Sequence, residues 1–171
     1  MQRRQAVTTL ATGFATILTL PTWAINWSQK TLKNTNFLSA ELAVALSEIV
    51  ETIIPETNTP GAKSLAIDKL IERIVKDCYQ KPAQVQFIEG IRLVNELSKK
   101  NHNKLFADCP TEQRLAVLLQ MSVSEDAGQK NFYDIVRQMT IKGYTSSEYF
   151  MTKIEHFEFA PARFHGCVKV K

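Results

Sequence analysis

Apolar residues recur every three or four positions through most of the chain, once a polar stretch ends near residue 37. Between residues 42 and 54 this spacing places the apolar residues on one face of a helix and the acidic and polar residues on the other, which predicts an amphipathic helix. Ser39 is placed as its N-cap, and Pro55 ends it because proline cannot continue a helix. Residues 56–61 then have the Thr, Asn, Pro and Gly composition of a turn.

The same spacing predicts further helices over 66–79, from Pro82 to about 103, from Pro110, and over 129–142. The positions assigned to their buried faces are Ile67, Leu70, Ile71, Ile74, Val75 and Cys78, then Phe87, Ile91, Val94 and Leu97, then Leu115, Leu118, Leu119 and Met121, then Phe132, Ile135, Val136 and Met139. Glu41, Ser47, Glu48 and Glu51 are assigned to the solvent face of the first helix.

Glycine and hydroxyl residues punctuate this pattern. Gly90 is expected to permit a close helix crossing, and Gly143 is expected to end the helix over 129–142. Residues 145–148 have the spacing of a capping box, so a short sixth helix is predicted over 149–157. The tail 159–171 is expected to be extended. The pattern therefore predicts an all-α fold, an irregular bundle of about six helices with an extended C-terminal tail.

The N-terminus has the layout of a signal peptide, with a basic start, an apolar middle rich in Thr, and small residues before Ala24. Adjacent Arg3 and Arg4 favour a twin-arginine signal, whose cargo is exported folded. The general secretory route and a retained membrane anchor are the alternatives. The predicted organisation is a signal peptide over 1–24, a polar linker over 25–37 and a helical domain over 38–171.

Composition removes several function classes. The formal net charge is +4, of which Arg3 and Arg4 supply two, and the remaining charges are interspersed, so nucleic acid is not an expected partner. The glycines are scattered, which excludes a phosphate or dinucleotide cradle in this chain, and no metal, haem or nucleophile motif is present. His156 lies between acidic residues and His165 lies near Cys167, but chain neighbours do not form a positioned site. No catalytic, cofactor-binding or metal-ligating residue is therefore assigned.

Three cysteines in an exported protein leave one unpaired or bridged to another chain. Cys78 and Cys109 fall at ends of predicted helices and are assigned as a possible disulfide, which leaves Cys167 as the unpaired or partner-linked thiol. The alternative is that all three are buried or free. Aromatic residues concentrate in the last thirty positions, where they either close the bundle or form a binding surface.

The sequence around the first predicted turn is similar to that of a known protein family. The run ETIIPETNTPGA over 51–62 resembles the gluconate 2-dehydrogenase subunit 3 family, the small accessory subunits of membrane-associated flavin-dependent sugar and polyol dehydrogenases. The other matching marks are Asp77-Cys78-Tyr79, Phe87, Gly90, the segment GYTSSE over 143–148 and the twin-arginine-like leader. Two departures are Asn58, where the family usually has Asp, and Ala66-Ile67, where Gly-Val is common.

The resemblance implies partners that hold the cofactors. The large subunit of such a complex carries FAD and the substrate pocket, and a multihaem cytochrome c subunit often passes electrons onward. The small subunit is thought to assist folding of the large one and to supply its export signal through the twin-arginine translocase. The expected location is the periplasm, with membrane association through the complex.

The leading hypothesis is thus a non-catalytic small subunit that assists folding and export of a FAD-dependent gluconate or sugar dehydrogenase. One alternative is a subunit that completes the substrate channel or the electron path, and another is a free-standing helical binding protein of the envelope. The residues assigned to the partner interface are Thr57, Asn58, Thr59, Pro60, Gly61, Tyr144, Ser147, Glu148 and Cys167.

Overall fold

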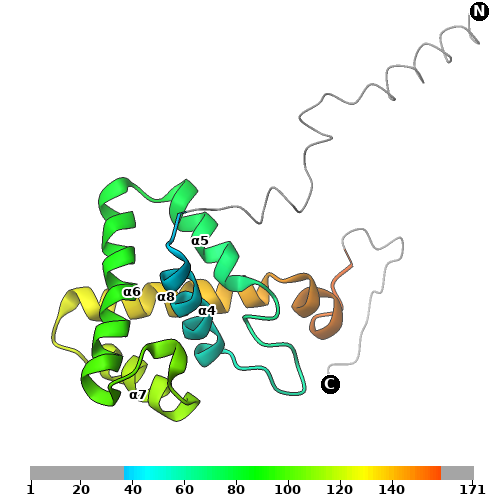
Figure 1. Ribbon diagram of the computed structural model, residues 1–171. Coiled ribbons are helices and arrows are strands. Elements are labelled where there is room, and N and C mark those ends of the chain that lie inside the picture. Colours follow the sequence, from blue (N-terminus) through cyan, green and yellow to red (C-terminus); the bar gives the residue numbers. More distant parts are fainter. Residues whose placement is uncertain (1–36, 159–171) are drawn as a thin grey trace, which may run out of the picture. The chain divides into compact units, whose positions relative to one another are not determined.

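The computed structural model describes residues 37–158 (Figure 1). Most of the predicted linker and the whole predicted signal peptide, with Arg3, Arg4 and Ala24, lie outside the described residues. The predicted C-terminal tail with Cys167 lies outside them as well.

The regular elements of the described part are all helices, with no strand among residues 37–158, which confirms the all-α prediction. Its elements are α4 (Ala40–Ile53), α5 (Ile67–Cys78), α6 (Lys81–His102), the 3-10 turn η1 (Phe106–Asp108), α7 (Thr111–Ser122), α8 (Ala127–Thr145) and the π-helix η2 (Phe150–Ile154). Within residues 37–158 no helix combines the length and apolar character needed to cross a membrane.

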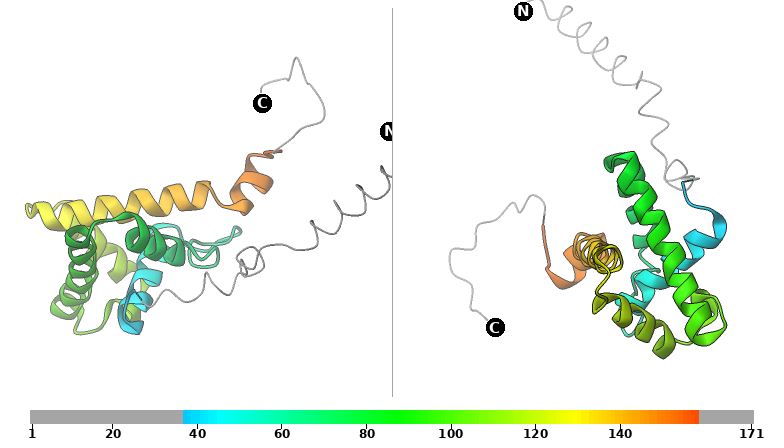
Figure 2. Two further views of the ribbon diagram at one scale, coloured as in Figure 1. Left: turned by 90° about the horizontal axis from the view of Figure 1, so that it is seen from above. Right: turned by 90° about the vertical axis from the view of Figure 1, so that its left-hand side faces the viewer.

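Helix α4 packs against every other α-helix of the described part, α5, α6, α7 and α8, and against η1. The two views of Figure 2 show α8 along one side of the domain, first from its flank and then nearly end-on, with the other helices gathered beside it. The largest fully buried side chains come from every α-helix and from η1: Leu46, Ile49, Val50, Ile71, Val75, Ile91, Val94, Phe106, Val117, Met121 and Val136.

Several helix boundaries follow the sequence signals. Ser39 caps α4, since its Oγ accepts the Leu42 N–H at 3.4 Å, and the helix ends before Pro55. Gly90 permits the predicted close crossing: a Cβ there would lie 2.2 Å from Phe132 Cδ2 of α8. The rings of Phe132 and Phe87 pack at a centroid distance of 5.5 Å in this crossing.

The predicted buried faces of α7 and α5 are partly wrong. In α7, Leu118 and Met121 are buried as predicted, but Leu115 and Leu119 are about half exposed, and Val117, which was not predicted, is buried. Leucine and valine occur on nearly all sides of α7, so spacing alone did not choose its inner face. In α5, Leu70 and Cys78 are exposed, and two acidic residues, Asp68 and Glu72, are buried. Glu72 is accommodated because its carboxylate accepts the Leu38 N–H at 3.2 Å.

The predicted end of α8 is also wrong. The helix continues through Gly143 to Thr145, and Gly143 lies against α5, where a Cβ would come within 3.0 Å of Ile67. The capping box fails because Thr145 Oγ1 donates back to carbonyls of its own helix. Ser147 Oγ accepts the Phe150 N–H at 3.3 Å instead, so the predicted sixth helix is the single π-turn η2.

Ala66 precedes α5 in the left-handed conformation, with φ 55° and ψ 36°. An L-residue other than glycine pays roughly 1–2 kcal/mol for that conformation. This is the position where the resembled family commonly has Gly, so the departure noted in the sequence carries a conformational cost.

The predicted disulfide between Cys78 and Cys109 is wrong, since both are free thiols. Cys109 is buried with its Sγ 3.1 Å from Ser98 Oγ, near the C-terminal end of α6. Cys78 is exposed three residues before α6 begins. The α6 rise from Lys81 to Ser98 is about 25 Å, far beyond the reach of a disulfide.

Candidate partner-binding site

The loop between α4 and α5 projects from the domain and has its own hydrogen bonds. Its base is closed where the Ala62 N–H donates to the Ile54 carbonyl at 3.0 Å, and its tip is bent where the Thr57 N–H donates to the Thr59 carbonyl at 3.0 Å. Thr57, Asn58 and Thr59 are exposed. The tip therefore presents polar side chains on a backbone of defined shape.

Glu51 fixes this loop from the last turn of α4. Its carboxylate accepts the Glu56 N–H at 2.8 Å and the Lys63 N–H at 3.0 Å, so it holds both sides of the loop. Gly61 lies directly under it: a Cβ at that position would be 2.6 Å from Glu51 Oε2 and 2.7 Å from the Glu56 nitrogen. Gly61 is buried, so its part in the loop is to let the carboxylate approach rather than to touch a partner.

Glu48, one turn earlier on α4, anchors the same segment by charge. It accepts from Lys63 Nζ at 2.6 Å and from Arg114 of α7 through a short ion pair. Arg114 also donates to the carbonyls of Phe106 at 3.1 Å and Ala107 at 2.7 Å. The loop is thereby connected through α4 to η1 and α7.

These charges shift the protonation equilibria of the pair. Burial would raise the pKa of Glu48, but the hydrogen bond from Lys63 and the positive charge of Arg114 together hold the pKa of this carboxyl below its usual value. The hydrogen bond and negative charge of Glu48 raise the pKa of Lys63. Both groups are therefore charged throughout the neutral range.

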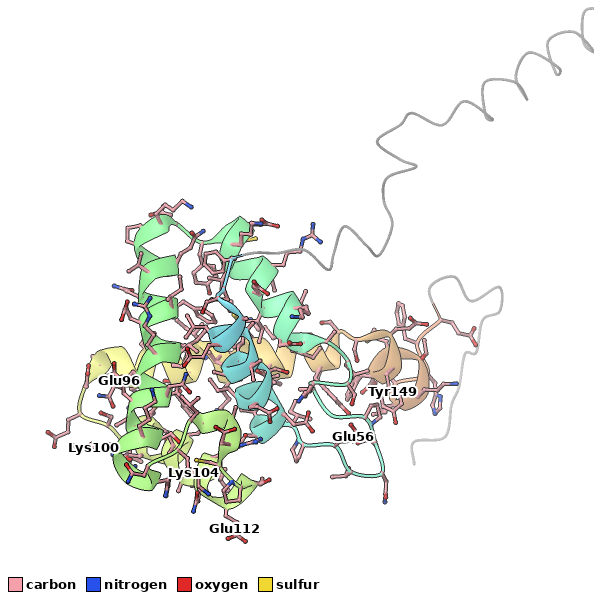
Figure 3. The ribbon with its side chains drawn as sticks, in the orientation of Figure 1. Glu56, Glu96, Lys100, Lys104, Glu112 and Tyr149 are labelled. Atoms are coloured by element: carbon pink, nitrogen blue, oxygen red, sulfur yellow. The ribbon has the colours of Figure 1, made fainter. Side chains whose placement is uncertain are left out.

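The second predicted interface segment contacts the loop directly. Tyr144 of α8 donates its hydroxyl to the Pro60 carbonyl at 3.1 Å, across 84 positions of sequence. Its ring is nearly buried and packs edge-to-face on Phe150 with centroids 6.0 Å apart. In Figure 3, Glu56 marks the loop and Tyr149 marks the chain just after α8. The structure thus brings 57–62 and 144–148 together.

A hollow of about 550 Å³ lies beside this contact. Ser147 and Glu148 line it, together with apolar side chains of α5 and its preceding turn, including Leu65 and Leu70. Glu148 is exposed and Ser147 half-buried. The site therefore offers an exposed polar loop next to an apolar depression, the combination of rim and core found in protein interfaces.

Of the predicted interface residues, Thr57, Asn58 and Thr59 are available at the tip, and Pro60 and Tyr144 join the two segments. Cys167 lies outside the described residues. Four residues that hold the loop were not predicted from the sequence: Glu48, Glu51, Lys63 and Arg114. The available signal was the pair of carboxylates one turn apart at the end of a helix, directly before a turn that needs acceptors for its N–H groups.

The site presents exposed hydrogen-bonding side chains and an apolar hollow. Across residues 37–158, no three His, Cys, Asp or Glu side chains are grouped where they could hold a metal ion. The groups brought together here are backbone N–H donors already paired, a structural ion pair and exposed hydroxyl and amide side chains. This arrangement suits the binding of another protein surface.

Comparison with known families gives one match. The family described as Gluconate 2-dehydrogenase subunit 3 matches residues 40–166, which includes the loop, α8 and both segments of the site. Comparisons with curated proteins and with solved structures gave no match.

Replacing Glu51 with Ala should loosen the loop without unfolding the domain. The amides of Glu56 and Lys63 lose a charged acceptor, so their hydrogen exchange should become at least about tenfold faster, equivalent to ~1.4 kcal/mol per site. Native-state hydrogen exchange measures this. Glu41→Ala, an exposed carboxylate of the same helix, should leave both amides unchanged, and unchanged exchange in Glu51→Ala would refute the anchoring role.

Glu48 should make stability depend on pH in the acid range. Its pKa is lower in the folded than in the unfolded state, so its contribution is present above the ordinary value of 4.5 and is lost as pH falls through the folded-state pKa. Glu48→Gln should cost about 1–2 kcal/mol at neutral pH and flatten the decline on acidification. Urea unfolding at a series of pH values tests this. Glu112→Gln on the exposed side of α7 serves as the control, and an equal slope in Glu48→Gln and wild type would contradict the assignment.

Proposed function

Since this chain belongs to the gluconate 2-dehydrogenase subunit 3 family, we propose that it binds the large flavoprotein subunit of a FAD-dependent sugar or gluconate dehydrogenase and assists its folding and export. The family makes the chain an accessory subunit of a dehydrogenase complex. Assistance in the folding and export of the large subunit is the proposed role.

The observation that carries the proposal is the hydrogen bond from Tyr144 to Pro60. It joins a projecting loop to the end of α8, and the family match includes both segments. A loop with exposed Thr57, Asn58 and Thr59 is braced here from two sides, by Glu51 within α4 and by Tyr144 from α8. These contacts fix the shape of an exposed surface that takes no part in packing the core.

A loop ordered before binding loses little conformational entropy when it binds. Each residue that must be ordered on association costs free energy, so a pre-formed loop leaves more of the contact energy as affinity. A subunit that must hold its partner before and during transport benefits from such an interface. The braced loop therefore supports a role in holding the folded large subunit.

The export part rests on the sequence. Arg3 and Arg4 open a leader of twin-arginine type, whose translocase carries folded cargo. A large subunit bound at the loop would travel with this chain to the periplasm. FAD is assigned to that partner, because the scattered glycines here form no dinucleotide-binding motif. A multihaem cytochrome c is the proposed electron-carrying neighbour, which would hold the complex at the membrane.

Co-expression with a large flavoprotein subunit of a FAD-dependent sugar or gluconate dehydrogenase tests the proposal. With the wild-type chain, the large subunit should appear in the periplasmic fraction with bound FAD. Without the chain, both the exported amount and the flavin content should fall at least about tenfold, the loss of an obligatory partner. Equal export and flavin content without the chain would refute the role.

A substitution at the tip of the loop tests whether the large subunit binds there. Asn58→Arg changes an exposed tip residue and should reduce co-purification of the large subunit while leaving the domain folded, because a charge at an interface centre must be desolvated. Gln80→Arg makes the same kind of change at an exposed position before α6. Equal co-purification by both variants would show that the partner binds elsewhere.

A further inference from the structure

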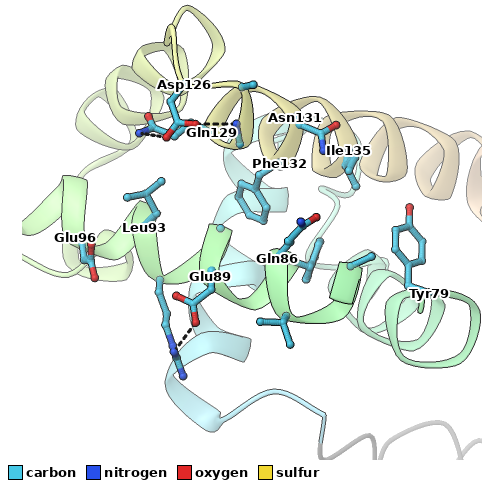
Figure 4. A pocket seen from close by; sticks show the side chains of 17 residues that line it. Tyr79, Gln86, Glu89, Leu93, Glu96, Asp126, Gln129, Asn131, Phe132 and Ile135 are labelled. Atoms are coloured by element: carbon cyan, nitrogen blue, oxygen red, sulfur yellow. Dashed lines mark hydrogen bonds and ion pairs between the residues drawn. The ribbon is translucent and has the colours of Figure 1, made fainter. Parts of the chain in front are cut away.

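A larger hollow lies at the other end of α8, away from the loop. It encloses about 670 Å³ between the first turns of α8 and the facing side of α6. Figure 4 shows Phe132 pointing into it from α8 and Leu93 and Gln86 lining it from α6. Because Gly90 has no side chain, the Phe132 ring rests directly on the α6 backbone and forms an apolar floor.

This hollow belongs to a continuous furrow along α8. Tyr79 and Ile135 line both the large hollow and a second one of about 340 Å³, and Leu70, Gly143 and Ser146 line both the second hollow and the one beside the loop. We name these three hollows together the α8 furrow. It follows α8 from Gly128 to Ser146 and leaves apolar side chains such as Leu70 accessible to solvent.

Charge is unevenly distributed along the α8 furrow. At the large hollow the acidic residues are Glu89, Glu96 and Asp126, against the single base Arg92, which is paired with Glu89 at 2.7 Å. At the opposite end the furrow is lined by Lys142 and Lys153, with Glu148. An occupant that matches this distribution is apolar along its length and carries its positive charge toward the start of α8.

The chain's own C-terminal segment has this chemistry. Residues 159–171 read FAPARFHGCVKVK, with large apolar residues throughout, basic Arg163, Lys169 and Lys171, and no acidic side chain. The described chain reaches residue 158 directly after η2, whose Thr152 and Lys153 line the near end of the furrow. We propose that residues 159–171 occupy the middle and large hollows of the α8 furrow, antiparallel to α8, with Lys169 and Lys171 at the carboxylates of the large hollow.

The segment is long enough for this path. Cys167 lies nine positions after Glu158, and nine residue steps span up to about 30 Å when extended. Along α8 the distance from Gly143 to Gln129 is about 21 Å, at 1.5 Å per residue. The extended segment therefore passes the middle of the furrow and brings Cys167 and the lysines to the large hollow. Its apolar residues would cover surface that the helices leave exposed.

Cross-linking through the native Cys167 tests this placement in the full chain. Gln86→Cys and Gln138→Cys put a thiol in the large and the middle hollow, and Leu115→Cys puts one on the exposed face of α7. Each variant carries Cys78→Ser to remove the exposed native thiol. Under oxidised glutathione, Cys167 should bond within the chain to position 86 or 138 at least about tenfold faster than to position 115, because docking raises the effective concentration. Peptide mass spectrometry identifies the bonds.

Charge-reversal variants test whether Lys169 and Lys171 meet the carboxylates of the large hollow or whether Cys167 reaches position 86 by random encounter. Glu96→Lys should slow the bond between Cys167 and position 86, and combining it with Lys169→Glu and Lys171→Glu should restore the rate. Glu112→Lys on α7 is the matched control and should have no effect. Equal rates to the furrow and α7 positions, or bonds only between separate chains, would overturn the proposal and leave the furrow to the leader or to a partner subunit. This result is independent of the export assay, so either proposal can fail alone.

Discussion

Two carboxylates on one side of α4 determine the shape of the candidate site. Glu51 holds the backbone of the loop at Glu56 and Lys63, and Glu48 holds the ammonium of Lys63. Lys63 is thus bound twice by the same helix, through its N–H and through its side chain. Because α4 packs against all the other α-helices of the described part, the loop is held by the core and lacks the mobility usual for an exposed connection.

The helices of this chain were predictable because their periodicity is strong and their ends carry direct signals. Ser39 and Pro55 delimit α4, and Gly90 marks the crossing of α6 with α8, as expected. The orientation of α7 was not predictable. Its residues Leu115, Val117, Leu118 and Leu119 offer several apolar faces, and only packing against α4, α6 and α8 selects one. The role of Gly143 was not predictable for the same reason. It packs against Ile67, a residue far away in sequence.

The site was predicted in its segments but not in its construction. The turn composition and the resemblance identified 57–62 and 144–148. The residues that hold them were assigned to solvent, because Glu48 and Glu51 lie on the polar face of an amphipathic helix. No local pattern links Tyr144 to Pro60 across 84 positions, and the exposed tip side chains have meaning only once the loop is known to be braced. Local spacing therefore determines the elements, and contacts between distant residues determine the surface.

We propose that the braced loop and the end of α8 form one surface that meets the dehydrogenase subunit. Hydrogen exchange of the chain, alone and in complex with that subunit, tests this claim most directly. We expect added protection at the amides of 57–59 and 145–148 together, with no change on the exposed face of α7. Unchanged exchange in the loop, with protection confined to α7 or to the middle and large hollows of the α8 furrow, would contradict this.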